Sequence, residues 1–481
     1  MNRVTSRQRK PLTSRQRKLI YLVAIVILLI PIIGWLGMPA TGSGGANGKE
    51  DGSGGRLARL RKTYQLGEST LGDVDPSSAT MNLVLLGLRG VAADLLWMKA
   101  IDYKEQKDWA KLRSTVDSIV LLQPHFVQVW QFQGWNLAYN VSAEWDSVKD
   151  RYYWVKEGGK FIRKGSERNE QTPELYWYNG DILGKKIGRS DEWKQFRKFF
   201  VVDPNTKRFH GRTDPEFNEL ELPDNYLAAR EKFKTANDRE NKHVQHVMMR
   251  ALFRSYPSHS LMEYAHALQR DGLFEEKSRI AWDEAFREWT EVYGKERFHS
   301  PAGWIHLEAT PADIDEFVRQ NSDELKQVAP DATDKQKHDF MRLWVDRYQS
   351  TANYRYWRTR ALTESDPITM AAHKQIYDGQ ELFKQQKISP GPGGEPSESE
   401  QNLYAGLQKY AIVLSKHPSL ISDDDTIEEV MTAMLYLRYL HQLNQTKNPR
   451  PLPKILVALW EHEKARLPTL QQRFRRENAI Q

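Results

Sequence analysis

Hydrophobic residues make up nearly all of a run near the N-terminus, between Leu19 and Met38. These twenty residues carry no charge. As a helix they would extend roughly 30 Å, the thickness of the hydrocarbon core of a bilayer. Pro31 is tolerated in such helices, and Trp35 lies near the far end, where aromatic rings favour the interface. The pattern predicts a transmembrane helix. A cleaved signal peptide and a buried core helix are the alternatives, but the run exceeds the usual signal-peptide core.

Charged residues flank this run on one side only. Seven basic residues and no acidic residue precede it, whereas the ten residues from Pro39 to Gly48 are uncharged. Because basic flanks stay in the cytoplasm, we expect the N-terminus inside and the C-terminal domain outside the cytoplasm. The expected location is therefore the cytoplasmic (inner) membrane, with a single pass.

Beyond this run, apolar residues recur with the period of a helix almost throughout. Segments rich in Ala, Leu, Glu, Lys, Gln and Arg alternate with breaks at Pro, Gly, Asn and Asp, and the alternation typical of strands is scarce. The predicted fold class is all-α: an N-terminal transmembrane helix followed by stacked α-helical hairpins, an α-solenoid. The expected segments are a basic cytoplasmic tail (1–18), the transmembrane helix (19–38), a Gly/Ser-rich flexible linker (39–55), an N-terminal helical-repeat domain (56–200), an irregular connector (201–225) and a C-terminal helical-repeat domain (226–481) with a disordered loop at 389–400.

Large and small residues repeat at a spacing of 34 residues, the length of one helix pair in several repeat families. If Pro124 ends the second helix of a pair, Leu96 and Ala100 lie on its first helix. Trp130 and Gly134 follow them at that spacing, without a gap. A small residue on one helix admits a bulky residue of its partner, so such a pattern predicts closely packed antiparallel helices.

Two later stretches follow the same pattern less regularly. Leu261, Ala265 and Leu268 fit a first helix, and an aromatic helix with Trp282 and Trp289 follows. Near the C-terminus, Gly379 and Gly406 fit one helix pair if fifteen residues are inserted between its helices. The Gly/Pro/Ser-rich loop at 389–400 accounts for that insertion.

These positions resemble the tetratricopeptide-like helical-repeat superfamily over about residues 80–190 and 245–440. More narrowly, three stretches look like a bacterial family of membrane-anchored repeat proteins sometimes labelled "iron-responsive element", although nothing in them indicates iron sensing or RNA binding. They are NLVLLGLRGVAADLLWMKAIDYKEQKDW, LQPHFVQVWQFQGWNLAYNVSAEWD and RYYWVKEGGKFIRKG. The resemblance implies a protein-binding scaffold.

Aromatic residues cluster between positions 130 and 154. Helical spacing places many of them on shared faces, which fits either packing between helices or a groove that holds a partner. The candidates for partner binding or repeat packing are Trp130, Gly134, Trp135, Tyr139, Trp154 and Trp177.

Charge and composition narrow the functional classes. The chain has 70 basic and 63 acidic residues, and the seven basic residues before the hydrophobic run account for the whole excess of +7. The remaining chain is balanced, so no nucleic acid is expected as a partner. There is no cysteine, which excludes disulfides and thiolate metal sites.

Two Glu-x-x-His sequences offer the main alternative. Glu240–His243 and Glu263–His266, separated by a break at Tyr256–Pro257, resemble half of a di-iron site on paired helices. The alternative function is an extracytoplasmic metalloprotein or enzyme using these middle helices. The acidic run at 423–425 lacks the ligand spacing of a calcium loop and fits a helix N-terminus.

The leading expectation is a membrane-anchored scaffold that mediates protein–protein interaction in the extracytoplasmic space. It is not an enzyme, and no catalytic residue, cofactor or metal is assigned. The expected partners are an unidentified protein or peptide of the cell envelope and the lipid bilayer, through residues 19–38.

Overall fold

The computed structural model describes residues 89–242, 248–274, 276–328, 330–392 and 394–478. This part of the chain is mostly helical, which confirms the all-α expectation. The predicted transmembrane helix at 19–38, its basic tail and the linker lie outside the described residues. None of the helices within the described ranges has the length and apolar character needed to cross a membrane.

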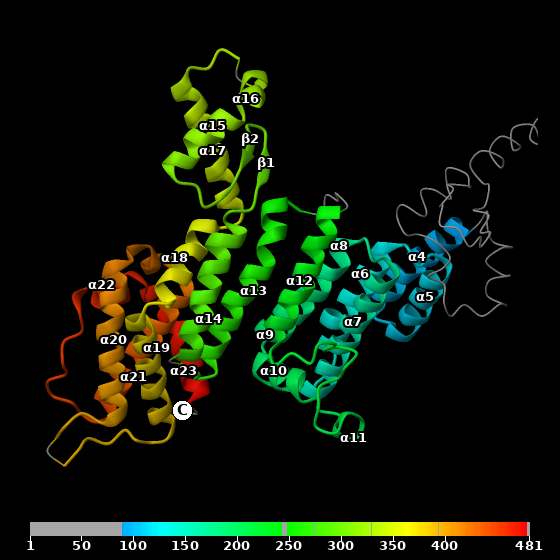
Figure 1. The fold of residues 1–481 in the computed structure, drawn as a ribbon. Helices are drawn as coiled ribbons and strands as arrows, with labels where there is room; N and C mark the ends of the chain where they lie inside the picture. Colours follow the sequence, from blue (N-terminus) through cyan, green and yellow to red (C-terminus); the bar gives the residue numbers. More distant parts are fainter. Residues whose placement is uncertain (1–88, 243–247, 275, 329, 393, 479–481) are drawn as a thin grey trace, which may run out of the picture. The chain divides into compact units, whose positions relative to one another are not determined.

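The chain divides into two compact units. The first unit comprises described residues up to Asn136 together with Phe161–Leu175, and the second comprises Leu137–Lys160 and the chain from Tyr176 onward. Helices of the first unit are α4 (Arg89–Glu105), α5 (Trp109–Leu122) and α6 (Val127–Trp135), with the later residues of α7 (Val148–Arg168) and the start of α8 (Pro173–Asp181). In Figure 1 these helices are coloured from blue to cyan-green.

The second unit contains the remaining elements. In order these are η3 (Asn136–Val141, of which Asn136 is counted with the first unit), η4 (Ile182–Lys186), α9 (Ile187–Arg189), α10 (Trp193–Val201), α11 (Thr206–Phe209), α12 (Asn225–Lys242), α13 (Arg250–Arg270), α14 (Glu276–Arg287), η5 (Glu288–Tyr293), β1 (Phe298–Ser300), β2 (Gly303–Ile305), α15 (Pro311–Gln320), α16 (Ser322–Val328), α17 (Asp334–Thr351), α18 (Tyr354–Glu364), α19 (Pro367–Lys384), α20 (Glu398–Lys416), η6 (Pro418–Ser422), α21 (Asp424–Leu443), α22 (Lys454–His462), η7 (Lys464–Arg466) and α23 (Leu467–Glu477). The segments η3, η4 and η5 are π-helical turns.

Helices α4 and α5 pack together in the first unit, as expected for a helix pair that ends near Pro124. Ala100 on α4 and Val116 and Ile119 on α5 are fully buried in one apolar cluster. On α6, Trp130 packs against Gly165, where a Cβ would collide with the indole. Gly165, which the 34-residue spacing does not select, thus admits the bulky side chain of Trp130.

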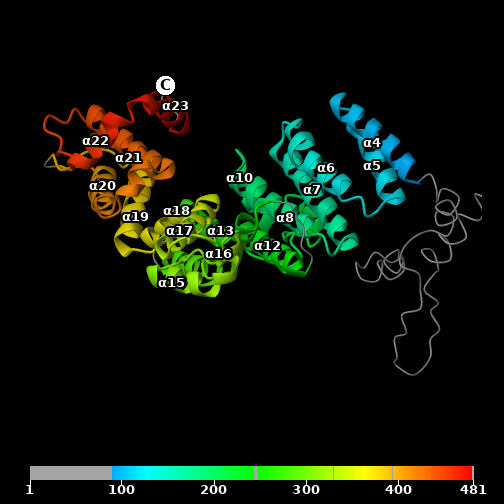
Figure 2. The ribbon, with the colours of Figure 1, turned by 90° about the horizontal axis from the view of Figure 1, so that it is seen from above.

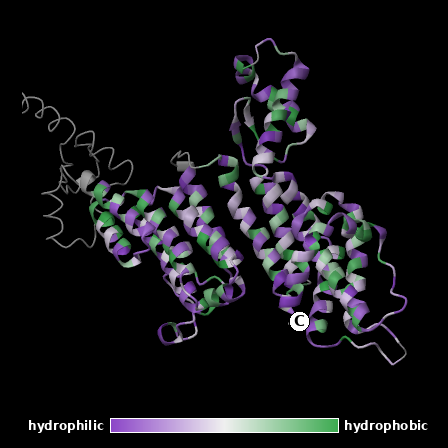
Figure 3. Cartoon of the chain, turned by 180° about the vertical axis from the view of Figure 1, so that it is seen from behind, coloured by the Kyte–Doolittle hydropathy of each residue, from purple (hydrophilic) through white to green (hydrophobic). Residues whose placement is uncertain are grey.

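In the second unit, each helix contacts mainly its neighbours in the sequence. Helix α12 contacts α13, α13 contacts α14, and α14 contacts α18. The series continues from α18 to α19, from α19 to α20, and from α20 to α21. Figure 2 shows α19, α20, α21 and α22 packed side by side. Hydrophobic and hydrophilic residues alternate along these helices (Figure 3), as expected for helices that bury one face.

Helices α19 and α20 form a closely packed hairpin in this unit. A Cβ on Gly379 would lie 2.7 Å from Cγ of Leu403, and one on Gly406 would lie 2.8 Å from Cγ1 of Ile376. The two glycines predicted as small positions therefore allow the helices to approach. The connecting loop ends at Ser397, whose side chain caps α20, so residues 398–400 of the predicted loop are helical.

A break was expected at Tyr256–Pro257, and this expectation is wrong. Helix α13 runs through Pro257 without interruption, and Pro257 is buried. A proline inside a helix removes one backbone hydrogen bond. Packing of α13 against both α12 and α14 offsets that loss.

An insert between Gly294 and Asn353 separates α14–η5 from α18. It contains the antiparallel hairpin of β1 and β2 and the helices α15, α16 and α17, which gather into one cluster in Figure 1. Capping boxes begin α15 at Thr310 and α17 at Thr333. Helices α14 and α18 contact each other directly, so the chain returns to the point where it left the stack.

Candidate functional site: a polar cleft lined by α13, α18, α19 and α21

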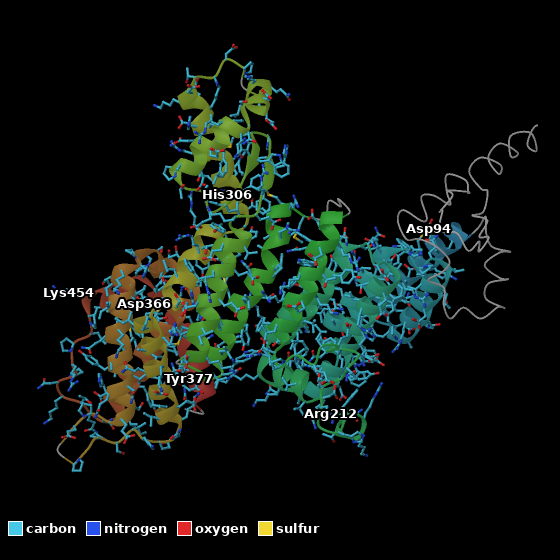
Figure 4. All side chains as sticks on the ribbon, viewed as in Figure 1. Asp94, Arg212, His306, Asp366, Tyr377 and Lys454 are labelled. Atoms are coloured by element: carbon cyan, nitrogen blue, oxygen red, sulfur yellow. The ribbon has the colours of Figure 1, made fainter. Side chains whose placement is uncertain are left out.

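Two adjoining cavities of about 460 and 570 Å³ form a cleft in the second unit. Both are lined by His266 and Arg270 of α13, Arg360 of α18 and Asp425 of α21. Tyr377 of α19, labelled in Figure 4, lines the first of them. We call this region the α13–α21 cleft. Its size is that of a site for a small molecule or a few residues of a peptide.

The wall of the cleft contains a buried ion-pair network centred on Arg360. The Arg360 guanidinium contacts Glu364 one turn later, with Nε 2.8 Å from Oε1. It also donates to Asp423, which begins α21. Burial favours the neutral forms, but the charges of Glu364 and Asp423 raise the pKa of Arg360 further above its ordinary value. Arg360 is therefore a fixed cation that joins α18 to α21.

His373 of α19 lies between two carboxylates in the same network. Its Nε2 is 2.8 Å from Oε2 of Glu364, and its Nδ1 is 2.7 Å from Oε1 of Glu429. Tyr410 of α20 donates to the other oxygen of Glu429 at 2.8 Å. Burial opposes the charged imidazolium, yet the two carboxylates raise the pKa of His373 to about 10. At neutral pH this ring is charged and donates from both nitrogens.

Asp423 has two roles in this network. Its carboxylate accepts the backbone N–H of Thr426 at 2.9 Å and so caps α21, as expected for the acidic run. It also accepts hydrogen bonds from Arg360 and from the hydroxyl of Tyr356. The cap of one helix is thus an ion-pair partner of another.

Arg270 differs from the other cations of the cleft because no carboxylate among the described residues pairs with it. It donates to the hydroxyl of Tyr226 at 3.1 Å, and its guanidinium lies 4.4 Å from the centroid of the Trp193 ring. Its Nε is buried and has no hydrogen-bond partner in the described part of the chain. Arg270 is therefore held in place, while its Nε–H can still donate a hydrogen bond to a ligand.

Two neighbours of Arg270 add further polar groups. Gln269 is 5% exposed and donates to Glu364 at 3.1 Å, while its Oε1 is buried without a partner among the described residues. Burial and the charges of Arg270 and Arg360 lower the pKa of His266 to about 3, so its ring is neutral. The cleft thus offers a cation, a neutral imidazole and an amide oxygen.

These groups are suited to binding rather than to proton transfer. An efficient general acid or base has a pKa near the working pH. The pKa of His266 lies far below neutrality and that of His373 far above it. The two rings keep one protonation state each, and so present a constant pattern of donors and acceptors.

The aromatic residues singled out from the sequence lie elsewhere. In the first unit, Trp130 is 6% exposed and donates to the carbonyl of Pro124 at 2.8 Å, and Gly134 is buried beside it on α6. Trp135 is 40% exposed, with the Lys104 ammonium 5.9 Å from its ring centroid. Trp130 and Gly134 are thus packing residues, whereas Trp135 faces solvent.

In the second unit the other three aromatic candidates lie apart. Tyr139 donates to Asp181 at 3.2 Å, and Trp154 stacks on Trp145 with centroids 6.2 Å apart. The ring of Trp177 lies 5.0 Å from that of Tyr256. Neither cavity of the cleft has any of the three in its lining.

The middle-helix glutamates are bound to arginines. Glu240 contacts Arg250 at 3.0 Å and Arg254 at 3.3 Å, and Glu263 pairs with Arg189. His243 lies outside the described residues. Within the described ranges, no group of three or more His, Asp or Glu side chains is arranged to hold a metal ion.

The sequence contained only a local signal for the cleft. Arg360 and Glu364 are four residues apart, a spacing typical of a helical ion pair, but such pairs are common on solvent-exposed faces. Nothing in the spacing indicates that Glu429 and His373 lie in contact. No protein-family model, curated protein or solved structure matches the chain.

Proposed function

We propose that this chain is a membrane-anchored, non-catalytic scaffold of tetratricopeptide-like helical repeats that holds a segment of a partner protein in the α13–α21 cleft. The observation that carries the proposal is Arg270, a cation without a described acidic partner in a cleft where the other cations are paired with carboxylates. Leaving such a group unpaired costs free energy, which a ligand would recover.

The form of the ligand follows from the groups in the cleft. Arg270 suits a carboxylate, and the exposed carboxylate of Asp425, which has no ion-pair partner in the described part of the chain, suits an ammonium or amide donor. A peptide carries both kinds of group. Helix pairs that stack on their neighbours form extended surfaces suited to peptides.

The membrane anchor belongs to the same proposal. The uncharged run at 19–38 would cross the inner membrane, and the linker at 39–55 would hold the helical units outside the cytoplasm. A partner in the cell envelope is therefore expected. The chain has no native cysteine, so Ser43→Cys can be labelled with a membrane-impermeant maleimide in intact cells. Labelling only after lysis would reverse the topology.

Site-specific photo-crosslinking tests the cleft. A photoreactive residue at Gln380, which lines the first cavity, should capture a discrete partner in intact cells. Arg270→Ala should reduce the captured product at least fivefold. Arg342→Ala, an exposed change on α17, should leave it unchanged. Crosslinking that is indifferent to Arg270 would refute the cleft as the binding site.

The alternative is a metalloprotein or enzyme of the middle helices. Glu240 and Glu263 would have to leave their arginine partners to bind a metal, which makes this function less favoured. Metal analysis of the purified full chain separates the two functions. Stoichiometric iron, manganese or zinc would support the metalloprotein, whereas its absence together with partner capture supports the scaffold.

A further inference from the structure

A third cavity, of about 430 Å³, lies in the second unit. It is lined by residues of η3 and the two residues that follow it, α7, η4, α9, the turn at 190–192 and α10, and it shares only Arg189 with the cleft cavities described above. We call it the η3–η4 pocket.

Two π-helical turns supply the walls of this pocket. Tyr139 comes from η3, and Lys185 and Lys186 come from η4. A π-helical turn inserts an extra residue into a helix and is found frequently at functional sites. Its effect is to turn side chains out of the regular helical positions. Here two such turns contribute to one cavity.

Positive charge exceeds negative charge in the pocket. Arg151 pairs with Glu192, and Arg189 pairs with Glu263. Lys185 and Lys186 have no carboxylate within ion-pair distance among the described residues. The remaining acid of the lining is Asp191, which is exposed to solvent.

Lys186 and Ser190 are the best-positioned groups for a ligand. The Lys186 ammonium lies 5.1 Å from the centroid of the Tyr139 ring, whose hydroxyl is fixed by Asp181. Burial lowers the pKa of Lys186, with a smaller contribution from the charge of Arg151, and outweighs the opposing effect of the carboxylates of Glu192 and Asp191. Ser190 Oγ is buried and has no hydrogen-bond partner in the described part of the chain. An anion with several oxygens would satisfy both groups.

We infer that the η3–η4 pocket binds a phosphate group, through the ammonium groups of Lys185 and Lys186 and the hydroxyl of Ser190. A phosphate dianion offers enough charge for two lysines and enough oxygens to accept from Ser190 as well. The phosphate can belong to a soluble compound or to a lipid headgroup, because the contacting chemistry is the same. This site does not depend on the proposed peptide cleft.

Calorimetric titration of the full chain with inorganic phosphate tests this inference. The protein is held in nanodiscs of phosphatidylcholine, which contain no phosphate monoester. Saturable binding is expected for the wild-type chain. Lys186→Gln should weaken it at least tenfold, and Ser190→Ala should also weaken it. Lys207→Gln, an exposed lysine on α11 outside the pocket, is the matched control and should bind as the wild type does.

Nanodiscs that contain phosphatidic acid identify the source of the phosphate. If they abolish binding of inorganic phosphate in the wild-type chain, the site accepts a lipid headgroup. If they have no effect, the site serves soluble phosphate compounds. No saturable binding, or equal binding by Lys186→Gln with an unchanged melting temperature, would overturn the inference. A Lys186→Gln variant that melts early is replaced by Lys186→Arg, which should retain binding.

Discussion

His373 and Glu364 form a buried ion pair in which Nε2 and Oε2 are 2.8 Å apart. The pair joins α19 to α18, and Glu429 of α21 holds the other side of the ring. A buried ion pair is costly to break because each charge has left water. Two consecutive helices, α18 and α19, are therefore linked to the more distant α21 by one protonated imidazole.

The stability of the chain should consequently depend on pH through His373. Its pKa is raised from 6.5 to about 10. A raised pKa means that the contribution is complete below pH 6.5 and is lost as the pH rises through 10. His373→Gln should lower the free energy of unfolding by about 3–5 kcal/mol at pH 6. The measurement is the urea midpoint of both chains, in detergent, from pH 6 to 10.

The difference between the two chains isolates His373 from the other titrating groups. It should shrink steadily as the pH rises from 6.5 to 10. A difference that stays constant over this window would show that His373 is neutral in the folded protein.

His259 should make the protein less stable as the pH falls, which is the opposite of the pH dependence expected from His373. Its ring lies between Trp289 and Trp357, with centroids 5.2 and 4.5 Å away, and burial together with the charge of Arg189 lowers its pKa to about 3. A lowered pKa keeps the folded ring neutral, so its contribution is complete above pH 6.5 and is lost as the pH falls towards 3. The chain with His259→Phe should therefore lose less stability than the wild type between pH 6.5 and 4, as measured by thermal unfolding. Equal slopes would contradict this expectation.

Truncation of Trp130 should lower the free energy of unfolding by the amount expected for a core residue. It packs on Phe161, with centroids 4.8 Å apart, and fills the space beside Gly165. Trp130→Ala should cost about 3–5 kcal/mol, the usual range for a buried aromatic residue. Trp135→Ala, on the exposed side of the same helix, should change stability by about 0.5 kcal/mol or less. Urea unfolding of both variants gives the comparison. An unchanged midpoint for Trp130→Ala, with loss of a captured partner, would assign it to an interface.

Two glycines should respond to alanine with opposite signs. Gly379→Ala places a methyl group 2.7 Å from Cγ of Leu403 and should destabilise the α19–α20 hairpin by about 1–3 kcal/mol. Gly184→Ala meets only the Cβ of Ala229 at 3.5 Å, an ordinary contact. Because alanine loses less backbone entropy than glycine, this second change should stabilise by about 0.5–1 kcal/mol. Circular dichroism melts decide both signs. Destabilisation by both would indicate that helix approach is not the relevant difference.

The helical pairing could be predicted from the sequence because it depends on local patterns. The positions of Gly379 and Gly406 indicated where two helices approach closely, and Asp423 indicated where α21 begins. Both signals lie within a single helix or at its end. Such signals need no knowledge of distant contacts.

The cleft could not be predicted in the same way. Arg360, His373 and Glu429 come from three helices, and their contact depends on how the hairpins stack. No pattern within one helix distinguishes them from surface charges. The strands β1 and β2 were also missed, because three residues each are too few to show an alternating pattern. The break expected at Pro257 is absent because tertiary packing outweighs the local preference of proline.

The insert between η5 and α18 has a consequence for evolution and for protein engineering. Its entry point, Gly294, lies against the hydroxyl of Tyr354 at its exit, where a Cβ on Gly294 would collide. Segments that leave and re-enter a fold at adjoining points tolerate changes of length well. Related chains should therefore differ most in size here, and a reporter domain spliced into the exposed turn at Pro330–Asp331 of the insert should preserve the stacking of α14 on α18.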